Sequence, residues 1–174
     1  MHSVVLALGI ARVLGGFADV GRDWREIEAK WPFLGWLSLL LALQLGWWFG
    51  LWARFSTMNE IGLSTFLVWF LVPASFYAAS RLLIPEFPEG SPPNLEQRFV
   101  EVRVPFYACL VVGVLPPLPG LPGAASAEWL LAAFGALAIT GVLVANPRWH
   151  TVLLLLMLAT FLTWLALART TLGA

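Results

Sequence analysis

The chain has 174 residues with ten basic and ten acidic side chains, so its formal net charge is zero. Hydrophobic residues make up 60% of it and charged residues 11%, whereas an ordinary soluble domain carries about 25% charged residues. A chain this apolar could not cover its own surface in water, which excludes a soluble globular or disordered protein. The absence of a basic excess excludes nucleic acid as a partner. We therefore expect a single integral membrane domain over residues 1–174, surrounded by the lipid bilayer.

Six apolar runs predict an all-α transmembrane helical bundle, because a helix needs about 20 apolar residues to cross the hydrocarbon core. They cover residues 3–20, 31–52, 61–84, 104–118, 127–145 and 149–168. The fourth run is short and ends in a proline-rich stretch, residues 116–122, that cannot continue a helix. We expect this run either to cross the membrane or to enter and return as a re-entrant segment.

The segment before the fourth run predicts a short amphipathic helix on the cytoplasmic surface. Residues 91–94 read SPPN, which combines capping residues with prolines suited to a first helical turn. Leu95, Phe99 and Val102 then fall on one helical face, and charged residues surround the rest. Such a helix would lie in the membrane surface and lead into the fourth run.

The basic residues predict the orientation, because cytoplasmic loops of membrane proteins carry an excess of Lys and Arg. The odd-numbered loops hold Arg22, Arg25, Lys30, Arg81, Arg98, Arg103 and Arg148. Only Arg54 and Arg169 lie on the opposite side. We expect the odd-numbered loops to be cytoplasmic. Nine of the ten basic residues are Arg, which is typical of a GC-rich bacterial genome, and so we expect a multi-pass protein of the bacterial cytoplasmic (inner) membrane.

Three polar residues within the apolar runs form a candidate intramembrane polar site: Arg12, Asp19 and Gln44. Arg12 lies near the middle of the first run, where a charge costs about 2.5–3.5 kcal/mol on insertion scales. Asp19 lies seven residues further and shares its helical face. Gln44 needs a hydrogen-bond partner in lipid. Two interpretations stay open: a site for an anion or polar substrate, or structural groups that hydrogen-bond to neighbouring helices.

Small residues four apart recur in three of the runs and predict close helix–helix approach, within one protomer or between protomers. They are Ala7, Ala11 and Gly15, then Gly46 and Gly50, then Ala132, Ala136 and Thr140. Tryptophans near the predicted helix ends indicate an aromatic belt at the membrane surfaces. They are Trp31, Trp36, Trp48, Trp52, Trp129 and Trp149, whereas the mid-run Trp69 and Trp164 are expected to be packing residues.

The sequence offers little for catalysis, and we expect no enzyme, no catalytic residues and no metal site. It contains no HExxH or GxSxG motif. Its two histidines, His2 and His150, fall at opposite membrane faces of the six-span topology, which disfavours a haem held between them. We predict no resident cofactor. Binding of a lipid-soluble ligand among the tryptophans, such as a quinone, carotenoid or chlorophyll, stays an alternative.

Three stretches resemble an uncharacterised family of small polytopic bacterial membrane proteins with no assigned function. They read Gly9-x-Ala11-x-x-Leu14-x-Gly16-x-Ala18, Trp31-Pro32-x-x-x-Trp36 with Gln44-x-x-Trp47-Trp48, and Asn146-Pro147-Arg148-x-His150. The resemblance covers most of the chain and implies a multi-pass membrane protein. It implies no activity and no site residues.

The scarcity of polar residues within the runs favours a non-catalytic accessory or scaffolding subunit packed in a larger membrane assembly. Its partners would be other membrane-protein subunits or copies of itself. The alternative is a small oligomeric ion channel or transporter in which Arg12 lines the path, and an Arg there would favour anions. Few hydroxyl or amide groups are available to line a continuous wet route.

Overall fold

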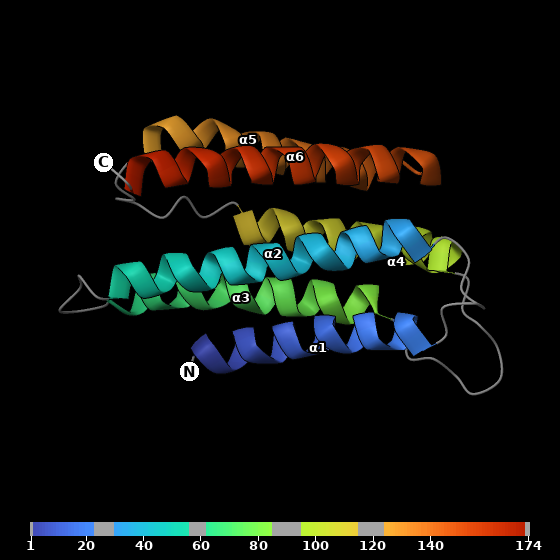
Figure 1. Ribbon diagram of the computed structural model, residues 1–174, viewed down its shortest axis with the longest axis horizontal. Helices are drawn as coiled ribbons and strands as arrows, with labels where there is room; N and C mark the ends of the chain where they lie inside the picture. Colours follow the sequence, from blue (N-terminus) through green and yellow to red (C-terminus); the bar gives the residue numbers. More distant parts are fainter. Residues whose placement is uncertain (1, 23–29, 56–61, 85–94, 115–123, 173–174) are drawn as a thin grey trace.

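The computed structural model describes residues 2–22, 30–55, 62–84, 95–114 and 124–172, nearly all of them in helices (Figure 1). The helices are α1 (His2–Arg22), α2 (Lys30–Phe55), α3 (Leu63–Leu83), α4 (Leu95–Val114), α5 (Ala124–Leu143) and α6 (Pro147–Leu172). Successive helices run in opposite directions, so that the last turns of α1, α3 and α5 lie at the same end of the bundle as the first turns of α2, α4 and α6. The described residues contain no strand, and the predicted all-α class is confirmed.

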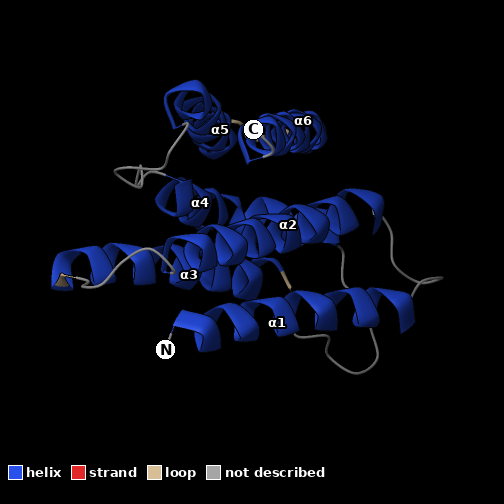
Figure 2. Cartoon of the chain, turned by 60° about the vertical axis from the view of Figure 1, so that its left-hand side comes forward, coloured by secondary structure: helices blue, strands red, loops and turns tan. Residues whose placement is uncertain are grey.

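The helices form a layered bundle in which α1 and the α5–α6 pair lie on opposite sides of α2, α3 and α4 (Figure 2). α1 packs on α2 and α3, α3 on α4, and α4 on α5, while α2 also contacts α6. The core lies where these helices meet. Its largest fully buried side chains include Trp36, Trp69, Tyr107 and Phe106.

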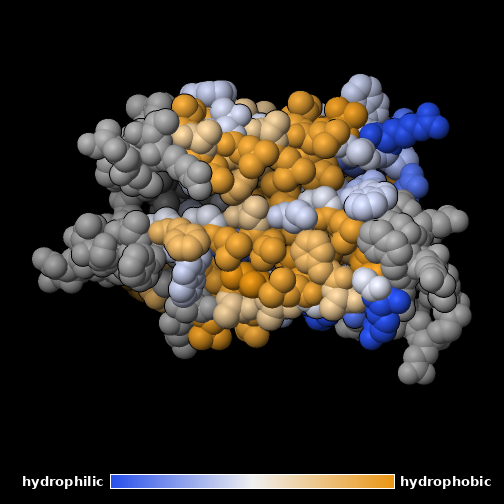
Figure 3. Space-filling view, in the orientation of Figure 1, coloured by the Kyte–Doolittle hydropathy of each residue, from blue (hydrophilic) through white to orange (hydrophobic). Residues whose placement is uncertain are grey.

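Four helices are long and apolar enough to cross a membrane: α1, α2, α3 and α6. In α5 the apolar stretch Trp129–Leu143 is shorter. Apolar side chains cover the middle of the visible face, and hydrophilic ones gather toward the end that holds the first turns of α4 and α6 (Figure 3). The helices are thus those of a helical membrane bundle, and length and composition support four of the six predicted spans.

The predicted surface helix and the fourth run are joined in a single helix, α4, which continues through Pro105. Leu95, Val102, Phe106 and Leu110 are buried at helical spacing on both sides of this proline, so one apolar stripe holds both halves against α3 and α5. The expectation of a separate surface helix is wrong for this reason. The apolar half, residues 104–114, extends only about 16 Å, whereas the hydrocarbon core is about 30 Å thick. Residues 91–94 lie outside the described residues.

The tryptophans lie at the surface or in the core as the sequence predicts, except for Trp36. Trp31, Trp129 and Trp149 are 70%, 57% and 56% exposed, as expected for a belt that faces lipid head groups. Trp36 is only 2% exposed and belongs to the core, so its assignment to the belt is wrong. It lies on the face of α2 that contacts the rings of α4. Trp69 is buried, as predicted. The side chain of Trp52 lies outside the described ones.

Several glycines lie at close contacts between different elements of the bundle. At five of them a side chain from another element occupies the space that a Cβ atom would take, so the two backbones approach more closely than larger residues allow. The pairs are Gly9 with Gln44, Gly16 with Ile84, Gly35 with Leu154, Gly113 with Phe76, and Gly141 with Tyr107. These contacts set the positions of the side chains described next.

Candidate functional site

Arg12 links α1 to the end of α3. Its Nη2 donates a hydrogen bond to the carbonyl oxygen of Ile84 at 3.1 Å. Ile84 is the C-cap residue of α3, and carbonyls at a helix end lack a partner within the helix. The Arg12 Nε atom is buried and has no hydrogen-bond partner among the described residues. This arrangement matches the structural interpretation of Arg12, in which the guanidinium satisfies a carbonyl of another helix.

Asp19 lies further along α1 and pairs with Arg22 rather than with Arg12. The Asp19 Oδ1 atom accepts a hydrogen bond from Arg22 Nη2 at 3.1 Å, at an exposed position one turn away. Exposed pairs of this kind contribute little to stability. Among the described residues, no hydrogen bond joins Asp19 to Arg12 or Gln44, so hydrogen bonding does not link the three predicted site residues.

Gln44 is fully buried in the middle of α2. Its amide lies against Gly9 of α1, the residue one turn before Arg12. Neither Nε2 nor Oε1 has a hydrogen-bond partner in the described part of the chain, and the same holds for the buried Nε1 of Trp47, one turn further along α2. A buried polar group without a partner costs about 1–3 kcal/mol. Gln44 therefore forms no interhelical hydrogen bond within the described protomer.

We expect Gln44→Leu to raise the free energy of unfolding by about 1–3 kcal/mol, because an apolar side chain of similar size replaces two unpaired polar groups. Thermal unfolding in mild detergent, followed by circular dichroism, measures the change. Ser38→Ala is the control, since Ser38 lies on the same helix and is exposed. A clear destabilisation by Gln44→Leu would contradict the prediction and show that the amide has a partner outside the described protomer.

A second polar pair joins α4 and α6, and the sequence analysis does not predict this contact. The Tyr107 hydroxyl and His150 Nδ1 are 3.0 Å apart in a buried hydrogen bond. Tyr107 is fully buried and His150 is 3% exposed. The Nε2 atom of His150 is buried without a hydrogen-bond partner among the described residues. Phe99 and Tyr107 lie eight residues apart, which places them on one face of a helix. This spacing alone does not identify the residue of α6 that faces them.

Aromatic rings surround this pair. Trp36 stacks on Phe99 with ring centroids 5.3 Å apart, and it meets Phe106 and Tyr107 edge-on at 5.3 and 5.5 Å. Phe99 also meets the His150 ring edge-on at 5.2 Å. Each such pair is worth about 0.5–1.5 kcal/mol beyond area burial. The five rings form an aromatic cluster that fixes α2, α4 and α6 to one another.

A cavity of about 180 Å³ lies beside the aromatic cluster, at the end of the bundle where α2, α4 and α6 begin. Its apolar walls are Pro32, Phe33, Trp36, Leu95, Phe99 and Pro147. Its polar walls are Glu96, Arg148, His150 and Thr151. Within the described residues, this cavity is a candidate binding site, and the buried His150 ring forms part of its wall.

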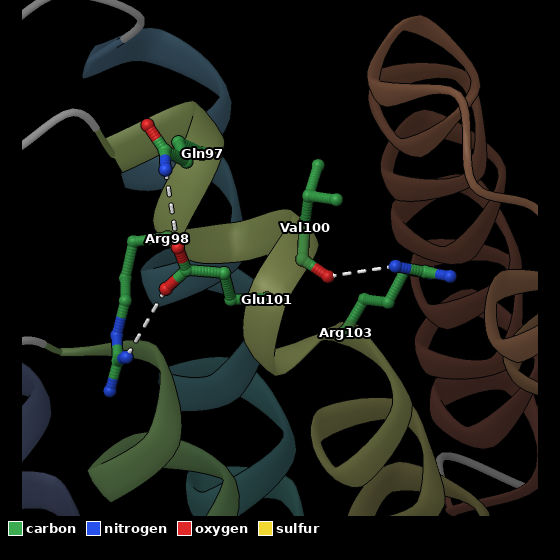
Figure 4. A network of polar contacts seen from close by, with 5 residues as sticks. All are labelled: Gln97, Arg98, Val100, Glu101 and Arg103. Carbon is green, nitrogen blue, oxygen red and sulfur yellow. Dashed lines mark hydrogen bonds and ion pairs between the residues drawn. The ribbon is translucent and has the colours of Figure 1, made fainter.

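Other polar and charged residues of α4 form a local network (Figure 4). Gln97 Nε2 donates to Glu101 Oε1 at 3.3 Å, and Arg98 Nη1 lies 3.5 Å from Glu101 Oε2. Arg103 turns away from these three and donates to the Val100 carbonyl at 2.9 Å. The first two contacts are exposed and belong to a solvated helix face.

The fold and these groups define a helical membrane protein with an aromatic cavity at one end of the bundle. Comparison of the chain with known protein families, curated proteins and solved structures finds no match. The resemblance of the three sequence motifs to a bacterial membrane-protein family therefore stays an expectation. Within the described ranges, no group of three or more His, Cys, Asp or Glu residues is arranged to hold a metal ion.

Proposed function

We propose that this chain is a non-catalytic, multi-pass protein that packs as an accessory or scaffolding subunit in a larger membrane assembly. The observation that carries this proposal is the position of the small-residue stripes. Ala7, Ala11 and Gly15 are all exposed on α1, and a Cβ atom at Gly15 would meet nothing within 4 Å. Among the described residues, no other helix covers this face of α1.

The corresponding stripe of α5 is likewise uncovered by the part of the chain that the structure describes. Ala132, Ala136 and Thr140 are exposed, and the nearby Gly135 has open space at its Cβ position. In lipid, helices associate by close packing of small side chains rather than by the hydrophobic effect. Because α1 and α5 lie on opposite sides of the bundle (Figures 1 and 2), two neighbours could be held at once. This geometry suits a subunit that connects partners.

We also propose that the protein resides in a bacterial cytoplasmic membrane with its odd-numbered loops in the cytoplasm. The helix directions support this orientation, because they bring the ends of α1, α3 and α5 to one side. Arg22, Arg81 and Arg148 lie near those ends. Basic residues of membrane proteins gather on the cytoplasmic side.

The proposal predicts that a bulky side chain on the α1 stripe abolishes association without unfolding the chain. The test is purification in mild detergent, with the mass of the complex measured for the wild type and for Gly15→Leu. We expect the wild type to run as a complex and the variant to dissociate, because leucine prevents close approach of the partner helix. Leu155→Phe is the matched control, since Leu155 is 61% exposed on α6, outside both stripes.

Two results would contradict the accessory role. One is a wild-type protein that is monomeric in lipid as well as in detergent. The other is anion flux through reconstituted liposomes that disappears in Arg12→Ala, which would favour the channel alternative. Arg12→Lys separates the charge from the hydrogen bond, because lysine keeps the positive charge but does not reproduce the planar, multi-donor guanidinium.

A further inference from the structure

We propose that the cavity between α2, α4 and α6 binds the head group of a zwitterionic phospholipid, which carries an ammonium and a phosphate. Two charged side chains border this cavity, Glu96 from α4 and Arg148 from α6, and both are exposed. Among the described residues, neither side chain forms an ion pair, whether with the other or with a third group. The cavity therefore presents one carboxylate and one guanidinium to the same ligand.

The opposite signs of these two groups select the class of ligand. An anion alone would be attracted by Arg148 and repelled by Glu96, and a cation alone would meet the reverse. A zwitterion satisfies both groups at once. Its phosphate oxygens match the forked donors of an arginine, and its ammonium donates to the carboxylate. A neutral ligand would use neither charge.

The apolar walls suit the short carbon chain of such a head group. Pro32, Phe99 and Pro147 are half-buried and line the cavity, so methylene groups can pack against them, and an aromatic ring also attracts an ammonium. A protein cavity of about 150 Å³ accommodates benzene. At about 180 Å³, this cavity holds a small head group, whereas the acyl chains of the lipid stay outside it.

The position of the cavity assigns this zwitterion to a lipid. Its walls belong to the first two turns of α2, α4 and α6. Trp31 and Trp149 are sequence neighbours of wall residues and are 70% and 56% exposed, and exposed tryptophans mark the head-group level of a bilayer. Phospholipid head groups surround the helices at that level. The exposed Leu155 and Leu156, further along α6, provide an apolar surface for the acyl chains.

The test is native mass spectrometry of the full chain, delipidated in mild detergent and titrated with phosphatidylethanolamine or phosphatidylglycerol of identical acyl chains. Both lipids carry the phosphate, but only the first carries an ammonium. Glu96→Gln removes the carboxylate of the cavity, and Arg148→Gln removes the guanidinium. Glu101→Gln and Arg98→Gln are the matched controls, because these two residues are exposed on α4 and lie outside the cavity wall. Thermal unfolding of each variant verifies that it is folded.

We expect the first phosphatidylethanolamine to bind at least about threefold more tightly than the first phosphatidylglycerol, which is the effect of one partly exposed ion pair. Glu96→Gln should remove this preference, Arg148→Gln should weaken the first binding of both lipids by about threefold, and the two controls should bind as the wild type does. Soluble phosphoethanolamine at equal concentration should not displace the lipid. Equal binding of the two lipids by the wild type, an unchanged preference in Glu96→Gln, or displacement by the soluble head group would overturn the proposal.

Discussion

Trp36→Ala is expected to lower the free energy of unfolding by about 3–5 kcal/mol, the usual cost of removing a large buried aromatic side chain. Trp36 is only 2% exposed and contacts Phe99, Phe106 and Tyr107 within the aromatic cluster. Its removal leaves a void where α2 meets α4, and the surrounding rings cannot collapse to fill it because each is held by the others. Thermal or denaturant unfolding in detergent measures the loss.

Trp31→Ala provides the matched control on the same helix. Trp31 is 70% exposed, so its truncation removes far less buried apolar surface than that of Trp36 and should cost much less stability. The same residue type, five positions apart, is therefore expected to show two very different effects. Equal losses in the two variants would show that the aromatic cluster does not hold α2 against α4.

Gly141→Ala is expected to destabilise the protein by about 1–3 kcal/mol or more, the range found when extra atoms are forced into a packed core. A Cβ atom at this position of α5 would overlap the ring of Tyr107. That ring is hydrogen-bonded to His150 and packed against Trp36, so it cannot rotate away without breaking the cluster. Unfolding in detergent again provides the measurement.

Gly135→Ala separates packing from the general effect of alanine in a helix. Gly135 lies on the same helix, and a Cβ atom there would meet nothing within 4 Å. Alanine is favoured over glycine in helices by about 0.5–1 kcal/mol, so this variant should be as stable as the wild type or more so. The double variant Gly141→Ala/Tyr107→Leu should recover part of the loss. A Gly141→Ala protein as stable as Gly135→Ala would refute the tight contact.

The order and extent of the helices follow from the sequence because the apolar runs and their breakers are local signals. The fourth run shows where local signals fail. Charged residues precede it and Pro105 lies at its start, yet the stripe that includes Val102 and Phe106 continues across the proline and keeps one helix intact. The stabilisation comes from α3 and α5, which no local pattern identifies.

In the candidate site too, local sequence patterns do not identify contacts between residues that are distant in the chain. Arg12 could be recognised as a buried charge, but its partner, the Ile84 carbonyl, lies 72 positions away. Tyr107 and His150 are 43 positions apart. Trp31 and Trp36 look alike as membrane-surface residues in the sequence, and only the position of α4 distinguishes them. Spacing along one helix predicts a shared face, whereas the residue opposite that face depends on how two helices are aligned.

The five glycine contacts have a mechanical consequence. Each glycine accommodates one particular side chain of another element. If a helix moved by one turn, about 5.4 Å, a larger residue would take the place of the glycine opposite that side chain. The glycine contacts therefore oppose translation of the helices along their axes. Tilting about these contact points, in contrast, keeps each glycine opposite its partner side chain. Any rearrangement of this bundle should proceed by pivoting of helices rather than by axial translation.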